Sequence, residues 1–92
     1  MIKNFIHKGL RKFYVSGNTA GIQKKHEIKR RLILANLDQA EEPDDMDLPS
    51  LFIHQLKGDR KDIWSVRVNG NCRITYKFTG RDVEIVNYED YH

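Results

Sequence analysis

The chain ends in a carboxylate, a phenol and an imidazole, carried in succession by Asp90, Tyr91 and His92. A second histidine, His54, lies in an apolar segment far upstream, and Lys57 follows it closely. These groups suit cleavage of an RNA phosphodiester through its 2′-hydroxyl. One group must take the hydroxyl proton, another must protonate the departing 5′-oxygen, and cations must stabilise the charged phosphorane. Histidine titrates near neutrality and can serve as the base or as the acid.

Two arginines could add to this set if the sheet brings them near it. Arg67 and Arg73 lie on the polar sides of two predicted strands, which the turn signal Asn69-Gly70 joins. An exposed pair of facing arginines is unfavourable unless an anion lies beside it. A lone strand histidine such as His54, however, is more often structural than catalytic. Spacing alone therefore does not establish that these groups converge.

Other catalytic chemistries find little support. None of the four histidines forms a metal-type spacing with another histidine or with the single cysteine, so no metal site is predicted. The chain has neither a glycine-rich phosphate loop nor a nucleophile elbow. We therefore predict no cofactor.

Charge is distributed unevenly along the chain. The first 37 residues carry nine Lys or Arg against one acid, and residues 38–50 carry six acids and no base. Basic residues crowd the first half of a predicted helix, where the helix dipole favours acids; they include Lys24, Lys25, Lys29 and Arg30. This conflict favours a polyanion such as nucleic acid, or an acidic protein, as partner. The alternative is a helix face that is only solvated.

Length and composition indicate one globular domain over residues 1–92. No apolar run approaches the length of a membrane span, and the opening residues lack a secretory apolar block. Cys72 is the only cysteine, which excludes an internal disulfide and fits a reducing compartment. The expected location is the cytoplasm, with no membrane partner.

The element pattern predicts an α+β fold. A first helix should end at Gly17, and a second should run from about residue 23 to 40 and end before Pro43. Its apolar face should include Ile28, Leu32 and Ala35, widened by Ile33, Leu34 and Leu37. Strands are predicted at 2–5, 51–56, 63–69, 72–78 and 82–90, with an acidic linker before the second of these and a type I′ turn at Asn69-Gly70. The two helices should pack on one face of a mostly antiparallel sheet.

Three segments together resemble the HigB family, the "host inhibition of growth" branch of the RelE-type bacterial toxins. They are HQLKGDR, WSVRVNGNCRI and the terminal VEIVNYEDYH. The opening IKNFIHKGLRKFY also fits, so the resemblance covers essentially the whole chain. It implies the RelE-like fold, with two helices on a small twisted antiparallel sheet. It also implies metal-independent cleavage of messenger RNA in the ribosomal A site, and hence inhibition of translation and growth.

The resemblance further assigns roles to residues. It implies that the catalytic residues are His54, Asp90, Tyr91 and His92, and that Lys57 and Arg73 handle phosphate. Lys24, Lys25, Lys29 and Arg30 should face ribosomal RNA, with Arg67 as a further RNA-binding residue. Asp90 or His54 is the preferred base and His92 the preferred acid. Cys72 stands where the family usually has Trp or Tyr, and Gln55 stands where it often has Pro.

The implied partner is HigA, a helix-turn-helix antitoxin that inhibits the toxin and represses their operon, so that operator DNA is reached only through the antitoxin. Two other functions stay open on sequence grounds. One is a toxin of the ParE branch, which poisons DNA gyrase by binding and does not need the terminal acid–base groups. The other is a non-catalytic RNA-binding module that uses the basic helix.

Overall fold

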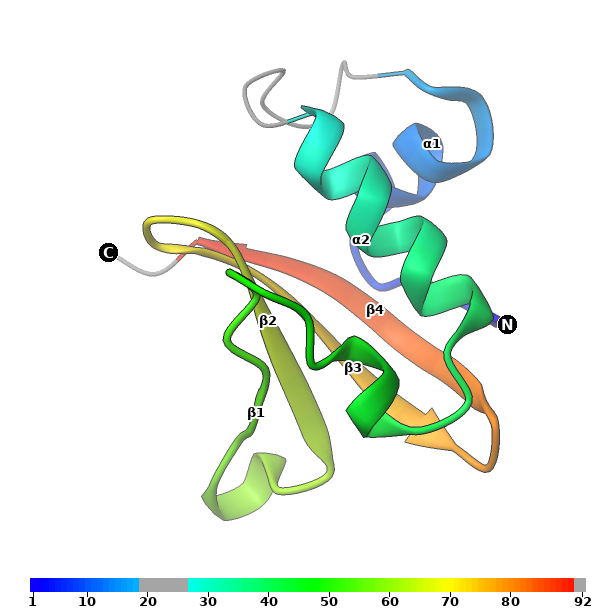
Figure 1. Ribbon diagram of the computed structural model, residues 1–92. Coiled ribbons are helices and arrows are strands. Elements are labelled where there is room, and N and C mark those ends of the chain that lie inside the picture. Colours follow the sequence, from blue (N-terminus) through cyan, green and yellow to red (C-terminus); the bar gives the residue numbers. More distant parts are fainter. Residues whose placement is uncertain (19–26, 91–92) are drawn as a thin grey trace.

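The computed structural model describes residues 1–18 and 27–90. Two helices, α1 (Lys8–Ser16) and α2 (Glu27–Gln39), cover one face of a four-stranded antiparallel sheet (Figure 1). The strands are β1 (His54–Gln55), β2 (Ile63–Asn69), β3 (Cys72–Thr79) and β4 (Asp82–Asp90), and they lie side by side in chain order. Short 3-10 helices occur at Pro43–Met46 (η1) and Gly58–Arg60 (η2). The predicted α+β architecture is confirmed.

The first helix is closed at both ends by local contacts. At its start, His7 Nδ1 accepts a hydrogen bond from Leu10 N at 2.9 Å. Burial lowers the pKa of His7, which favours the neutral ring that can accept this bond. At its end, Gly17 adopts φ +76° and donates its N–H to Phe13 O at 2.8 Å. The predicted stop at Gly17 is confirmed, because glycine adopts the left-handed conformation without a steric penalty.

The second helix buries a different face from the predicted one. Its buried residues are Arg30, Ile33, Leu34 and Leu37. Ile28 and Leu32 are exposed instead, and so is Ala35. Both stripes satisfy the helical period, and the aliphatic stem of Arg30 takes the place of an apolar residue in the buried one. The prediction for Ile28, Leu32 and Ala35 was therefore wrong. Residues 23–26 of the predicted helix lie outside the described part of the chain.

The sheet contributes its alternate residues to the core. Val66 and Val68 of β2, Ile74 and Tyr76 of β3, and Val86 of β4 are fully buried beneath the helices. Within the described residues, neither helix has the length and apolarity needed to span a membrane.

Two predicted elements near the sheet's ends differ from the structure. The expected strand over 51–56 is reduced to two residues, because Phe52 (φ +49°) and Ser50 (φ +67°) depart from an extended backbone. At the β2–β3 turn, Asn69 pairs with Cys72, which leaves Gly70 and Asn71 as the loop. Of these two residues only Gly70 has a positive φ, at +50°, so the turn is not the expected type I′, which needs a positive φ at both central residues.

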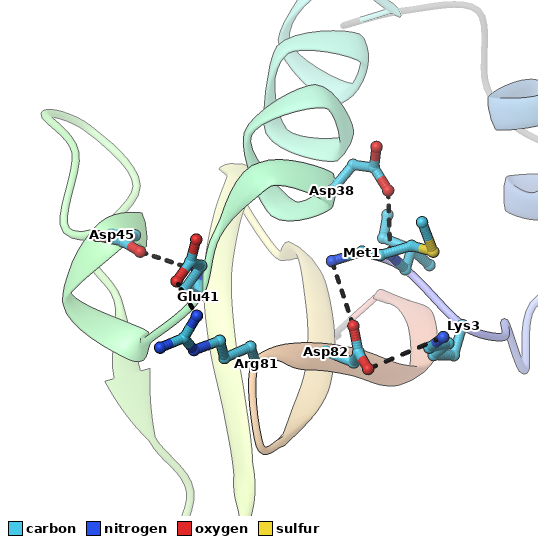
Figure 2. A network of polar contacts seen from close by, with 8 residues as sticks. Met1, Lys3, Asp38, Glu41, Asp45, Arg81 and Asp82 are labelled. Atoms are coloured by element: carbon cyan, nitrogen blue, oxygen red, sulfur yellow. Dashed lines mark hydrogen bonds and ion pairs between the residues drawn. The ribbon is translucent and has the colours of Figure 1, made fainter.

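The amino terminus lies along the outer edge of β4. Ile2 and Phe5 form isolated parallel bridges with this strand, so the predicted opening strand is present only as single bridges. Asp38 Oδ1 accepts a hydrogen bond from Ile2 N at 3.0 Å. Asp82 pairs with the terminal ammonium group of Met1 at 3.7 Å and with Lys3 at 3.8 Å (Figure 2). These contacts join the chain's start to the end of α2 and to the β3–β4 turn.

The acidic segment that was predicted as a linker is an ordered part of the fold. Asp45 accepts hydrogen bonds from the backbone N–H groups of Glu41 and Glu42, at 2.9 and 3.2 Å. The Glu41 carboxylate pairs with Arg81 at 3.5 Å across the β3–β4 turn (Figure 2). Met46, at the end of η1, is fully buried in the core. Its burial explains why this charged segment folds back onto the sheet.

Candidate active site

Strand register gathers polar residues on the sheet face that points away from the helices. Arg67 faces Arg73, which in turn faces Glu89. His54 faces Ser65, two residues from Arg67 on β2 and therefore on the same side. The opposite side carries Tyr88, which contacts the helices through Arg30. The structure thus brings His54, Arg67 and Arg73 onto one face.

His54 is exposed on β1, and its ring contacts the neighbouring backbone. Nδ1 lies 3.4 Å from the carbonyl oxygen of Phe52. A carbonyl oxygen only accepts hydrogen bonds, so Nδ1 is the donor in this contact, and Nε2 is the ring nitrogen that remains for a substrate hydroxyl.

The two arginines converge on one carbonyl at the hairpin end of the sheet. Arg73 Nη1 and Arg67 Nε donate to Gly70 O, at 3.1 and 3.4 Å. The Arg67 guanidinium also lies over the Phe52 ring, 5.4 Å from its centroid. The shared carbonyl offsets part of the repulsion between the two cations, and their fixed forks suit a phosphate.

An ion pair that the sequence did not predict spans this face. Arg60 donates to both oxygens of Glu89, at 3.2 and 2.6 Å, and the Thr75 hydroxyl donates to the same carboxylate at 2.7 Å. Burial by itself raises the pKa of Glu89, but the hydrogen bonds from Arg60 and Thr75 and the Arg60 charge outweigh it and hold the pKa below its ordinary value. Strand alternation could have placed Glu89 on the polar side. Its partner in the η2 turn could not be read from local sequence.

The remaining predicted residues are placed in part. Lys57 is exposed just before η2, the turn that Arg60 ties to β4. The backbone of Asp90 pairs with Cys72 at the hairpin end of the sheet, close to the Arg67–Arg73 pair. Tyr91 and His92 of the predicted catalytic set lie outside the described residues, as do Lys24 and Lys25 of the predicted RNA-binding set.

Comparison with known proteins settles the family. Residues 3–92 match the model of the HigB-like toxins, described as the RelE-like toxin of the type II toxin–antitoxin system HigB. The chain belongs to this family. It is also 40% identical to the Endoribonuclease HigB of Proteus vulgaris, over 92 residues that make up the whole of both chains. As a type II toxin, the HigB-like protein has an antitoxin as its partner.

One predicted RNA contact of the HigB-like toxin is corrected by the structure. Arg30 was expected to face ribosomal RNA, but it is fully buried. Its guanidinium lies over the rings of Phe13 and Tyr88, 5.6 and 5.8 Å from their centroids. Arg30 therefore joins α1, α2 and β4 inside the protein through cation–π contacts. Lys29, the neighbouring predicted contact, is half-buried, and its ammonium group donates to Ser50 O at 3.4 Å.

Cys72 of the HigB-like toxin immediately precedes Arg73 on β3, and strand alternation puts the two side chains on opposite faces of the sheet. It is partly buried and packs against the core. Burial and the neighbouring Cys72 thiol raise the pKa of Tyr88 to about 12, although Arg30 acts in the opposite direction. Tyr88 thus stays protonated near neutrality and does not serve as an acid–base group. In the strand register, Cys72 lies opposite Asp90.

Proposed function

We propose that this HigB-like toxin is an endoribonuclease that cleaves messenger RNA in the A site of the ribosome, in the cytoplasm, and thereby stops translation. The observation that carries the proposal is the strand register that puts the exposed His54 on the same face of the sheet as the Arg67–Arg73 pair. A base and two forked cations on one face suit attack of a 2′-hydroxyl on its own phosphate. The name of the Proteus vulgaris relative agrees with this reaction.

Roles follow from the chemistry of each group. His54 or Asp90 takes the 2′-hydroxyl proton, and His92 protonates the departing 5′-oxygen. Arg73 and Lys57 stabilise the negative charge of the phosphorane, and Tyr91 orients the substrate. This reaction needs no metal, because the protons move between side chains and the cations are supplied by the protein.

The substrate and partners are macromolecular. Lys24, Lys25 and Lys29 contact ribosomal RNA of the small subunit, with affinity that falls as salt concentration rises, and Arg67 is a further RNA-binding residue. The antitoxin is a helix-turn-helix protein of the HigA type, through which alone the toxin reaches operator DNA.

Mapping messenger RNA 5′ ends after brief induction tests the proposal. Wild-type protein should produce new ends in reading frame within translated regions. His54→Ala and His92→Ala should abolish both these ends and growth arrest while leaving the fold intact, which circular dichroism can check. His26→Ala, at a histidine to which no role in the reaction is assigned, is the matched control for loss of an imidazole. Full cleavage by His92→Ala protein would overturn the assigned mechanism.

Truncation separates this function from gyrase poisoning. Removal of Tyr91 and His92 should abolish growth arrest if the toxin cleaves RNA. A toxin that binds gyrase should keep its toxicity after this truncation and should produce gyrase-linked DNA breaks without new RNA ends.

A further inference from the structure

Phe52 is an exposed aromatic residue held in an unfavourable backbone conformation. Its side chain is 64% exposed, and its φ is +49°. Phenylalanine is normally buried, and a bulky residue with positive φ is uncommon because its Cβ crowds the backbone. Strain of this kind persists where surrounding contacts impose it, and it gathers at functional sites.

Neighbouring contacts hold Phe52 in this position. Leu51, immediately before it, is buried in the core, and its carbonyl accepts a hydrogen bond from Arg67 N at 2.6 Å. The carbonyl of Phe52 itself lies 3.4 Å from His54 Nδ1. The segment is therefore anchored on both sides of Phe52, while the ring projects from the surface.

A cation lies over the ring. The Arg67 guanidinium is 5.4 Å from the Phe52 centroid and is steadied by Gly70 O at 3.4 Å. Single-stranded RNA is commonly held by bases that stack on aromatic rings and on guanidinium planes. Phe52 and Arg67 offer both surfaces together. Among the described residues, the one other aromatic ring with a large exposed fraction is that of Tyr14, which is 36% exposed and packs against the Phe5 ring. Val15, Ile28 and Leu32 are also exposed, but they are aliphatic and cannot stack in this way.

We propose that Phe52 and Arg67 form a stacking subsite for a nucleobase of the messenger RNA, next to the phosphate that is cut. The inference rests on the proposed function and names the substrate element that this part of the site binds. Arg67 faces Arg73 across the sheet, and His54 follows Phe52 closely in the chain. A nucleobase stacked on Phe52 would therefore bring its nucleotide close to His54, the proposed general base, and to the arginines of the site. The phenyl ring offers no hydrogen bonds, so the subsite tolerates different bases.

Replacement of the ring tests the proposal. Phe52→Leu keeps an apolar side chain but removes the stacking surface, and should slow cleavage of translated messenger RNA about 5- to 100-fold. Phe52→Tyr keeps a ring and should cleave faster than Phe52→Leu. Val15→Ala removes exposed apolar surface from α1 and is the matched control, with cleavage unchanged.

Phe52→Gly separates a functional role from a structural one. Glycine accepts a positive φ, so this variant should unfold at the same temperature as wild type or higher, while its cleavage falls as in Phe52→Leu. Loss of thermal stability in Phe52→Gly would instead show that the ring supports the fold, which would overturn the proposal. Because glycine fits this backbone, the test does not depend on Phe52→Leu folding well.

Direct binding distinguishes failure of the subsite from failure of the proposed function. A short single-stranded RNA that carries 2-aminopurine should lose fluorescence on binding to His54→Ala protein. The loss of fluorescence should be smaller with the double variant that carries both His54→Ala and Phe52→Leu. If wild type cuts no messenger RNA, the proposed function fails. If wild type cuts but Phe52→Leu cuts equally at the same positions, the subsite fails. Loss of antitoxin binding with unchanged cleavage would assign Phe52 to the antitoxin interface and would also overturn the proposal.

Discussion

Arg60 holds the Glu89 carboxylate through two hydrogen bonds, 3.2 Å from Nη1 to Oε1 and 2.6 Å from Nη2 to Oε2. The pair connects η2, which follows Lys57, to the last strand, one residue before Asp90. Two parts of the proposed site that are far apart in the chain are thus fixed to one another. The ion pair acts on the positions of site residues without being one of the reacting groups.

Glu89→Gln should lower stability at neutral pH by about 1 kcal/mol, because Arg60 is half exposed and solvent screens the pair. The folded state holds the pKa of Glu89 below its ordinary value of 4.5. The stability advantage of wild type over Glu89→Gln should therefore be complete above pH 4.5 and should be lost as pH falls through the lowered pKa of Glu89. Urea unfolding of both proteins from neutrality down to about pH 3 measures the difference. A difference independent of pH would contradict this assignment.

Arg30→Met should lower stability by about 2–4 kcal/mol, because it removes a buried guanidinium from two aromatic rings and leaves a cavity. Lys29→Ala, at the half-buried neighbouring position, should leave unfolding nearly unchanged but weaken binding to the small ribosomal subunit and reduce the salt dependence of that binding. Urea unfolding measures the stability of both variants, and binding of Lys29→Ala to the small ribosomal subunit is measured at several salt concentrations. Near-wild-type stability of Arg30→Met would contradict the structural role of Arg30.

Arg73→Lys should slow cleavage about 10- to 100-fold while changing stability little, since lysine keeps the charge but loses the fork that binds phosphate bidentately. Single-round primer extension on translated messenger RNA measures the rate. Arg81→Lys, an exposed site at the far turn of the sheet, is the control and should cleave normally. Equal rates for both variants would show that charge alone suffices at position 73.

Gly17→Ala should cost about 1 kcal/mol, because its φ of +76° strains any residue with a Cβ although no atom lies close enough to clash. Gly17→Asn should cost less, since asparagine tolerates the left-handed conformation better. Thermal unfolding of the three proteins gives the ranking. A larger loss for asparagine than for alanine would contradict backbone strain as the cause.

Local signals predicted those parts of the fold that depend on neighbours in the chain. Gly17 ends α1 as expected, and the alternation around Asn69-Gly70 correctly set Arg67 and Arg73 on the polar sides of their strands. A register shift between Arg67 and Asn69, which the alternation did not predict, makes the two arginines face each other. Long-range packing decided the rest. Two apolar stripes on α2 obey the same period, and only contact with the Phe13 and Tyr88 rings selects the one that contains Arg30.

For the candidate site, too, the sequence predicted the features that depend on local pattern and missed those that depend on distant contacts. Strand parity could place His54 and the two arginines on a common face. It could not predict that the chain leaves the extended conformation at Phe52, where the buried Leu51 fixes the backbone. Nor could it predict the Arg60–Glu89 pair, which joins residues from distant segments.

The bridges from Ile2 and Phe5 to Val83 and Val86 have a consequence for self-association. An uncovered edge strand presents unpaired N–H and C=O groups that can pair with another molecule. The opening segment covers this edge of β4, where Lys3 N and Ile6 N donate to Val83 O and Val86 O at 2.7 and 2.8 Å. Detachment of the opening segment should therefore expose β4 to edge-to-edge pairing between toxin molecules.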